Sequence, residues 1–143
     1  MNKYNIISLI SKIRTNVNRH IEHEMARHNM IGIVTSHGDI LYALFRKERM
    51  TMAELAEAIG KDKSTVTSLV RKLEDLGYVQ KDRSSKDARI VYVTLTEKGN
   101  SLKPSFDQIS ADIINKVFKD IPESEQDELF RLLKKVYDNL NVL

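Results

Sequence analysis

The stretch of sequence that decides the fold runs from Thr51 to Gly99 and reads TMAELAEAIGKDKSTVTSLVRKLEDLGYVQKDRSSKDARIVYVTLTEKG. Its first half predicts two short helices, the first of which opens with a Thr-x-x-Glu capping box. Residues 78–81 and 90–95 are rich in β-branched and aromatic side chains and predict two strands. A basic turn without large apolar residues joins them. This order of elements predicts a helix–turn–helix followed by a hairpin, which together form a winged helix–turn–helix.

The second of these helices, expected over residues 63–76, separates its apolar and polar residues at about 100° per residue. Its apolar residues share one side: Val66, Leu69, Val70, Leu73 and Leu76. Polar residues take the opposite side and the flanks: Ser64, Thr65, Thr67, Ser68, Arg71, Lys72 and Asp75. Small residues would let the helix enter a DNA major groove about 12 Å wide, where Arg71 could bind a guanine edge or a phosphate. The alternative for such a face is a solvated surface helix, because most amphipathic helices bind nothing.

The expected turn of the wing carries a carboxylate and a guanidinium two residues apart, Asp87 and Arg89. In an extended segment both side chains can lie on one side, so that the carboxylate holds the guanidinium extended. An extended arginine fits a narrow minor groove, where the negative potential is enhanced. The alternative is a surface salt bridge worth less than about 1 kcal/mol.

Composition limits the class of protein. The 143 residues correspond to about one domain, and 41% hydrophobic with 30% charged residues is ordinary for a globular protein. No apolar run is long enough for a membrane span, and the N-terminus has no export signal, so we expect a cytoplasmic protein. Cysteine is absent, which excludes disulfides and thiol chemistry. The net charge is only +3, but residues 61–89 hold 8 basic and 5 acidic groups, where a groove-binding surface would lie.

Long amphipathic helices are expected on both sides of this module. Helical spacing of apolar residues predicts one helix over 4–30 and another after an N-cap at Thr35 or Ser36. Two more follow, over residues 102–118 and from Pro122 onward. Their apolar faces exceed what a winged module can cover, which favours dimerisation, although they could also pack within one subunit. We therefore expect a dimerisation helix in residues 1–34, a DNA-binding module in 35–99 and dimerisation helices in 100–143.

The segment Lys86–Gly99 resembles the wing signature of MarR-type transcriptional regulators. In that family an Asp-x-Arg at the tip of the wing leads into a strand ending Leu-Thr-x-x-Gly, here Leu95 to Gly99. Residues 52–56 and 64–79 resemble the helix before the recognition helix, and the recognition helix with its exit. The resemblance covers essentially the whole chain. It implies a mainly α winged helix–turn–helix fold with about six helices and a two- to three-stranded wing sheet, assembled as an obligate homodimer.

The expected function is a sequence-specific DNA-binding transcriptional regulator, a ligand-responsive repressor that binds a pseudo-palindromic promoter site as a homodimer. We expect these residues to contact double-stranded DNA: Ser36, Lys63, Ser64, Thr65, Thr67, Ser68, Arg71, Lys72, Arg83, Lys86, Asp87 and Arg89. The alternative is a winged-helix protein-interaction module, but such a module would expose aromatic or aliphatic anchors where this helix carries small and basic residues.

Neither an enzyme nor a cofactor-binding protein is indicated, because the chain has no phosphate-binding loop, nucleophile elbow or His-Glu-x-x-His motif. The family resemblance implies a small aromatic or phenolic effector in the crevice between the dimerisation helices and the winged module. Its peroxide-sensing branch is excluded, since that branch uses a cysteine. The sequence assigns no role to the four histidines, which do not form a second cluster that would close a metal site: His20, His23, His28 and His37.

Overall fold

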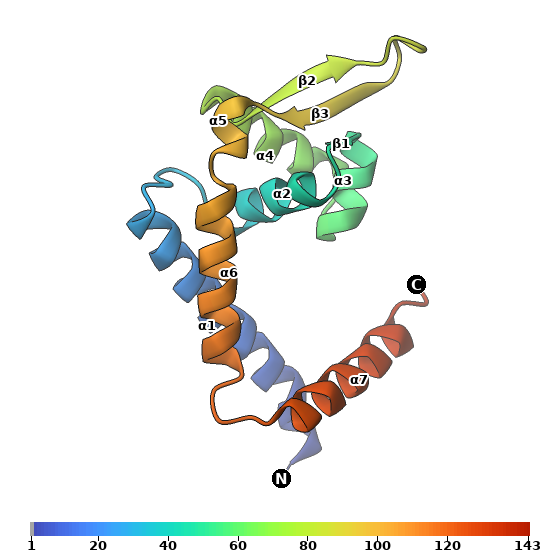
Figure 1. Ribbon diagram of the computed structural model, residues 1–143. Helices are drawn as coiled ribbons and strands as arrows, with labels where there is room; N and C mark the ends of the chain where they lie inside the picture. The colour runs from blue at the N-terminus through green and yellow to red at the C-terminus, as the bar shows by residue number, and fades with distance from the viewer. Residues whose placement is uncertain (1) are drawn as a thin grey trace. The chain divides into compact units, whose positions relative to one another are not determined.

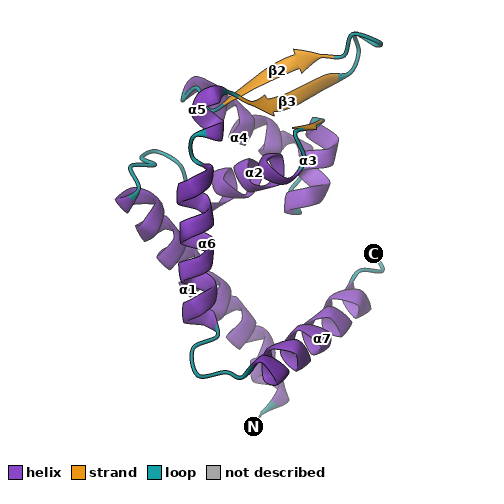
Figure 2. Cartoon of the chain, viewed as in Figure 1, coloured by secondary structure: helices purple, strands orange, loops and turns teal. Residues whose placement is uncertain are grey.

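The computed structural model describes residues 2–143 and is mainly helical, with one small antiparallel sheet (Figures 1 and 2). A 3₁₀ turn at Lys3–Asn5 precedes the elements α1 (Ile6–Arg27), α2 (Thr35–Arg46), β1 (Arg49–Met50), α3 (Met52–Ile59), α4 (Lys63–Asp75), β2 (Val79–Arg83), β3 (Val91–Leu95), α5 (Glu97–Asn100), α6 (Lys103–Val117) and α7 (Glu123–Leu140). This order confirms the predicted winged helix–turn–helix. The one-turn helix α5 is additional to the expected six helices. No helix within residues 2–143 is long and apolar enough to cross a membrane.

The sheet has the strand order β1–β3–β2, and both pairs are antiparallel. Strands β2 and β3 form the predicted hairpin, with Val79 opposite Leu95 and Arg83 opposite Val91. The third strand, β1, is only two residues long and pairs Arg49 with Thr94. A two-residue strand has no periodicity to detect, so the sequence could predict only that the sheet had two or three strands.

The core of the winged module lies where α2, α3 and α4 pack on one another and on the sheet (Figure 1). Its largest side chains are less than 2% exposed: Ile40, Leu41, Leu44, Leu55, Val66, Val70, Leu73 and Val93. Full burial of one such side chain stabilises the fold by about 1.5–3 kcal/mol. These contacts fix α4 against α3, and thereby determine which face of α4 remains in solvent.

The ends of α3 and α4 follow the signals in the sequence. The Thr51 hydroxyl accepts the N–H of Glu54, and the Glu54 carboxylate accepts the N–H of Thr51. Gly60 closes α3 with a left-handed backbone, φ +68°. At the end of α4, Lys98 donates to the Leu76 carbonyl at 2.8 Å. The positive charge of Lys98 interacts favourably with the negative end of the α4 dipole, and its hydrogen bond joins α5 to α4.

Two predicted helix boundaries were wrong. Helix α1 covers a shorter span than residues 4–30, because Asn29 adopts a left-handed backbone, φ +63°. Helix α2 has Val34 at its N-cap, so neither Thr35 nor Ser36 is the cap. The Thr35 hydroxyl instead donates to the Glu22 carboxylate of α1 at 3.1 Å. A tertiary hydrogen bond thus takes the group that would have capped the helix.

The chain divides into two compact units, one up to Ile109 and one over Ser110–Leu143. The first contains the winged module together with α1 and the start of α6. Within it, His28 Nδ1 lies 3.0 Å from the Ser105 hydroxyl and connects the end of α1 to α6. The second contains the rest of α6 and the whole of α7. Helix α7 has no buried residue.

Candidate nucleic-acid interface

Helix α4 presents the face that its periodicity predicts. Val66, Val70 and Leu73 are completely buried, whereas Ser64 and Arg71 on the other side are exposed. The outer apolar positions Leu69 and Leu76 are half-buried at the edge of the core. The solvent face is therefore polar, and its N-terminal half consists of small side chains, as entry into a groove requires.

The N-terminus of α4 is capped by a carboxylate. Asp62 accepts the N–H of Thr65 and the hydroxyl of Ser64, both at 2.8 Å. These two hydrogen bonds lower the pKa of Asp62, which therefore stays charged. Because this carboxylate occupies the positive end of the helix dipole, α4 does not offer its N-terminus to a phosphate. Cations along the helix, Lys63 and Arg71, are better placed for that contact.

Two of the hydroxyls expected to contact DNA have partners in α4 or at its N-cap. Thr67 donates to the Lys63 carbonyl at 2.9 Å, and Ser64 donates to Asp62. Each hydroxyl oxygen keeps its capacity to accept, because the hydrogen alone is used. Thr65 and Thr67 are half-buried on the flanks, while Ser68 is exposed. These residues form one shallow surface along α4.

Lys72 lies on the flank of α4 that faces the loop between α1 and α2. Its Cε is 4.0 Å from the position that a Cβ on Gly32 would occupy. Burial and, secondarily, the charge of Lys72 lower the pKa of His37, whose Nδ1 accepts the Val34 N–H at 3.0 Å. Ser36 is the next residue to His37, in the first turn of α2, and is half-buried. Lys72 is therefore near the start of α2, away from the centre of the small-residue face.

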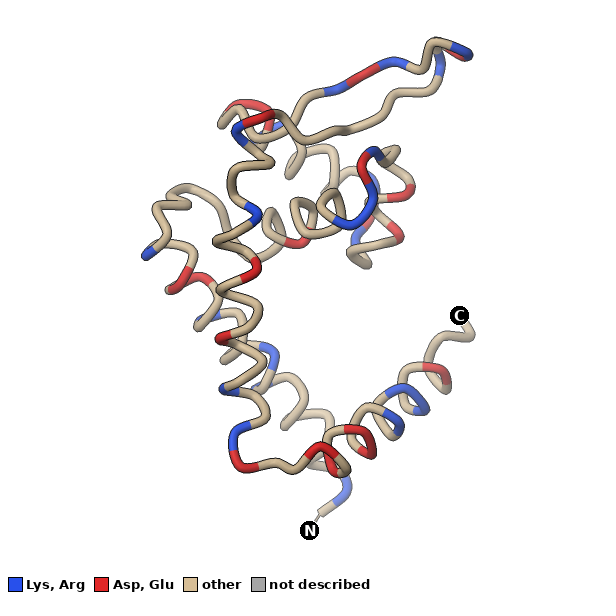
Figure 3. Tube along the Cα trace, in the orientation of Figure 1, with Lys and Arg blue, Asp and Glu red and all other residues tan. Residues whose placement is uncertain are grey.

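The wing carries the ion pair that the sequence predicts. Arg89 Nε and Nη2 each donate to a different oxygen of Asp87 at 3.1 Å, and the Arg89 backbone N–H donates to the same carboxylate at 3.0 Å. These bonds lower the pKa of Asp87. The side chain of Arg89 is nevertheless 90% exposed. The guanidinium is thus oriented by its partner and still open to solvent. Figure 3 shows that positively and negatively charged positions gather along the turn of the wing.

Hydrogen bonds within the turn involve one residue that sequence reasoning missed, Ser84. Its hydroxyl oxygen accepts the backbone N–H groups of Lys86 and Asp87 at 3.2 and 3.3 Å. Arg83, expected to contact DNA, donates from Nη1 to the Ala88 carbonyl at 2.6 Å. A serine that accepts from the second and third residues after it is a recognised turn pattern, so this signal was present in the sequence.

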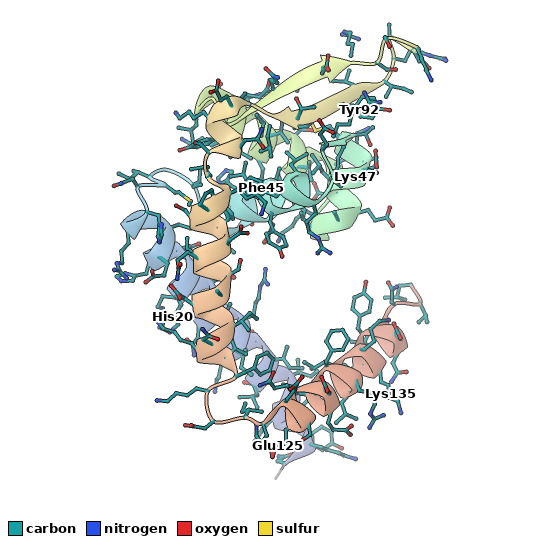
Figure 4. All side chains as sticks on the ribbon, in the orientation of Figure 1. His20, Phe45, Lys47, Tyr92, Glu125 and Lys135 are labelled. Carbon is teal, nitrogen blue, oxygen red and sulfur yellow. The ribbon has the colours of Figure 1, made fainter. Side chains whose placement is uncertain are left out.

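The hairpin is tied to the rest of the module by charged side chains. The Nζ of Lys81 in β2 lies 3.3 Å from Oε1 of Glu74 in α4. This ion pair connects the wing to α4. On the other face of the sheet, Arg49 lies over the ring of Tyr92 with its guanidinium carbon 4.2 Å from the centroid (Tyr92 is labelled in Figure 4). Sequence reasoning missed Arg49, because its partner is 43 positions away and the strand that carries it is too short to predict.

A groove of about 480 Å³ lies where α1, α2 and α3 meet. Its polar side chains include Arg14 and Asp39, whose charged atoms are 3.9 Å apart. Burial raises the pKa of Asp39, and the charges of Arg14 and Lys61 oppose that rise. The remaining lining combines an aromatic ring, two cations and apolar residues: Tyr42, Ala43, Arg46, Lys47, Met50, Ala58 and Ile59. Lys47 is labelled in Figure 4.

The histidines do not form a common site. His28 and His37 make the separate contacts described above, and His20 and His23 are exposed on α1. Within residues 2–143, no group of three His, Cys, Asp or Glu side chains is arranged to hold a metal ion. None of the histidines lines the groove between α1, α2 and α3.

Known proteins resemble this chain in sequence and in fold. The family described as Transcriptional regulator SarA/Rot matches residues 33–106. The HTH-type transcriptional regulator SarZ of Staphylococcus haemolyticus (strain JCSC1435) is 36% identical over 102 residues, which are 70% of this chain and 67% of that protein. SarZ of Staphylococcus aureus (strain MRSA252) is 32% identical over 104 residues, covering 70% and 69%.

Among solved structures, a MarR transcriptional regulator from Methanosarcina mazei Go1 superposes with a TM-score of 0.83 at 27% identity, covering 96% of both chains. A mutant MarR from E. coli complexed with operator DNA superposes with a TM-score of 0.81 at 23% identity, covering 95% of this chain and 99% of that one. The fold is therefore shared along nearly the whole length of these regulators.

Proposed function

The chain belongs to the SarA/Rot family of transcriptional regulators, and we propose that it binds an operator in double-stranded DNA as a homodimer. This membership agrees with the MarR-type resemblance of its wing and recognition helix. We assign it no catalysis, because its family consists of regulators. We expect it to act in the cytoplasm.

We propose that α4 enters the major groove and that the wing reaches the adjacent minor groove. The single observation that carries this proposal is the bidentate Asp87–Arg89 pair, which orients a guanidinium that remains 90% exposed. An oriented, extended arginine is what a narrow minor groove attracts. The low polar face of α4 supplies the second contact, with Arg71 at a base edge or phosphate.

The remaining cations have simpler proposed roles. Lys63, Lys86 and Lys72 neutralise phosphates, and Ser36 contacts the backbone from the start of α2. Small hydroxyls on α4 contribute hydrogen bonds to bases or phosphates: Ser64, Thr65, Thr67 and Ser68. Phosphate contacts of this kind set the position of the protein, whereas contacts to base edges supply specificity.

The proposed homodimer is supported by apolar side chains that the subunit leaves in solvent. On α1, Ile7 is 65% exposed, and on α7, Phe130 is 71% exposed. Each belongs to a longer exposed row: Ile6, Leu9, Ile10 and Ile13 on α1, and Leu129, Leu132, Leu133, Val136, Tyr137 and Leu140 on α7. Contiguous apolar surface of this kind marks an interface. We therefore assign dimerisation to residues 1–34 and 100–143, and DNA binding to residues 35–99.

A ligand-responsive repressor also needs a place for its effector. We propose the groove between α1, α2 and α3, because it joins a dimerisation helix to the winged module. Tyr42, with Arg46 5.8 Å from its ring centroid, suits a small aromatic or phenolic molecule. The effector would release DNA only if it bound more tightly to a dimer whose two recognition helices are wrongly spaced.

Binding to a defined duplex tests the proposed function. We would select an operator from a random-sequence pool, label it and measure affinity by fluorescence anisotropy. Arg89→Ala should weaken binding by about 5- to 160-fold, because loss of one specific arginine contact costs about 1–3 kcal/mol. The control Lys119→Ala removes one positive charge from outside the winged module and should bind as the wild type does. If selection enriches no sequence, the chain is a protein-interaction module and not an operator-binding regulator. If Arg89→Ala binds the selected operator as tightly as the control does, the proposed minor-groove contact of Arg89 is wrong.

A further inference from the structure

The turn that carries Arg89 is closed by backbone hydrogen bonds at both ends. The Ser84 N–H donates to the Ile90 carbonyl at 2.9 Å, and the Ile90 N–H donates to the Asp87 carbonyl at 3.0 Å. Residues 84–90 would otherwise form a seven-residue loop between the last strand pair, Arg83 and Val91. Ordering a free loop costs conformational entropy at every residue, so these bonds matter before any DNA is bound.

Ser84 holds the first half of this turn. Its hydroxyl oxygen accepts two consecutive backbone N–H groups, those of Lys86 and Asp87. Asp87 is also the residue whose carboxylate accepts two hydrogen bonds from the Arg89 guanidinium. These two bonds hold the backbone that leads into Asp87, the residue on which the position of the carboxylate depends. The serine therefore acts on Arg89 through Asp87.

Arg83 holds the second half. Its Nη1 donates to the carbonyl of Ala88, the residue between Asp87 and Arg89. Because the guanidinium is charged, this bond to a neutral carbonyl oxygen is charge-assisted. A lysine would keep the charge but would lack the planar fork that spans the turn to this carbonyl.

We propose that Ser84 and Arg83 are positioning residues that preorganise the wing for DNA. The inference rests on the proposed function of Arg89 as the residue that enters the minor groove. Preorganisation raises affinity because less conformational freedom is lost on binding. Arg83, expected from the sequence to contact DNA, thereby acquires a role within the wing itself.

A double-mutant cycle tests this coupling with the selected operator and fluorescence anisotropy. Ser84→Ala should weaken binding by about 3- to 10-fold, the range that loss of one hydrogen bond produces. In an Arg89→Ala background the same change should alter affinity by less than about 1.5-fold, since coupled residues are not additive. Ser84→Thr retains the hydroxyl and should restore binding. Ser85→Ala is the matched control, because Ser85 makes none of these bonds.

Arg83 is tested by Arg83→Lys, which keeps the charge. We expect weaker binding with an unchanged dependence on salt, whereas wild-type affinity would overturn the positioning role of Arg83. Equal losses from Ser84→Ala in both backgrounds would overturn that of Ser84. An Arg89→Ala variant that binds as tightly as the wild type would instead refute the proposed minor-groove contact. Circular dichroism on every variant confirms that the fold is retained.

Discussion

Gly99→Ala is the substitution whose effect the structure predicts most directly. Gly99 lies in the single turn of α5, where its backbone has no special conformation. A Cβ at this position would lie 2.1 Å from the carbonyl oxygen of Tyr78 and 3.1 Å from Leu95 Cδ2. The oxygen belongs to backbone and would have to retreat by about 1 Å to reach even the 3.0 Å limit of real contacts. Close approach therefore explains the glycine of the Leu-Thr-x-x-Gly signature.

The size of the effect follows from what that carbonyl does. The Tyr78 oxygen accepts the N–H of Thr96 at 3.0 Å, a bond that joins the exit of α4 to the start of α5. Overpacking of a tight site costs about 1–3 kcal/mol. Loss of the hydrogen bond adds about 0.5–1.5 kcal/mol. We expect Gly99→Ala to lower the free energy of unfolding by about 2–4 kcal/mol.

Urea unfolding at one fixed protein concentration measures this loss, because the stability of the proposed dimer would depend on concentration. The matched control is Gly38→Ala in α2, where a Cβ would meet Met25 and Phe106 at an ordinary 3.6 Å. That variant should be as stable as the wild type or gain up to about 1 kcal/mol from helix propensity. A Gly99→Ala protein within about 0.5 kcal/mol of the wild type, the scatter of neutral surface changes, would refute the close-packing explanation.

Three further outcomes are expected. Thr51→Ala should lower the free energy of unfolding by about 1 kcal/mol, because its hydroxyl caps α3, whereas Thr51→Ser should not; equal urea midpoints would contradict the cap. Burial and the charge of Lys72 lower the pKa of His37 from 6.5. The contribution of His37 to the free energy of unfolding is therefore fully present above about pH 6.5 and is lost as the pH falls below it. His37→Gln should flatten that decline in urea midpoints, and His20→Gln, on the exposed surface of α1 (Figure 4), should keep it; an unchanged slope in the first variant would exclude His37 as its source. Log affinity for the operator should fall linearly with log salt, and Lys86→Ala should reduce the slope by about 0.9, whereas an unaltered slope would mean that Lys86 contacts no phosphate.

Most of the candidate site could be predicted because its signals are local. The buried row of α4, including Val66 and Val70, repeats with the helical period. Asp87 and Arg89 are two residues apart, and their contact needs only an extended segment between them. The capping box from Thr51 to Glu54 spans four residues. In each case the interacting groups are so close in the chain that local geometry alone brings them together.

Interactions between distant segments escaped prediction. The N-cap of α2 was predicted wrongly at Thr35 or Ser36, because the Thr35 hydroxyl donates to Glu22 on another helix and does not cap its own. Arg49 lies over Tyr92 because β1 pairs with β3, which brings these two residues together. Periodicity in one segment carries no information about such partners.

The sequence by itself determined the order of the elements, the polar face of α4 and the pairing at the tip of the wing, since these depend on neighbours within about one turn of helix or one loop. Only the tertiary structure decided that Gly99 must lack a side chain, because the obstructing atom belongs to Tyr78, 21 positions earlier in the chain. The tertiary structure also decided that Lys81 of β2 pairs with Glu74 of α4, the proposed recognition helix. The physical reason is that such contacts arise from packing whole elements together, and packing places residues side by side irrespective of their separation in sequence.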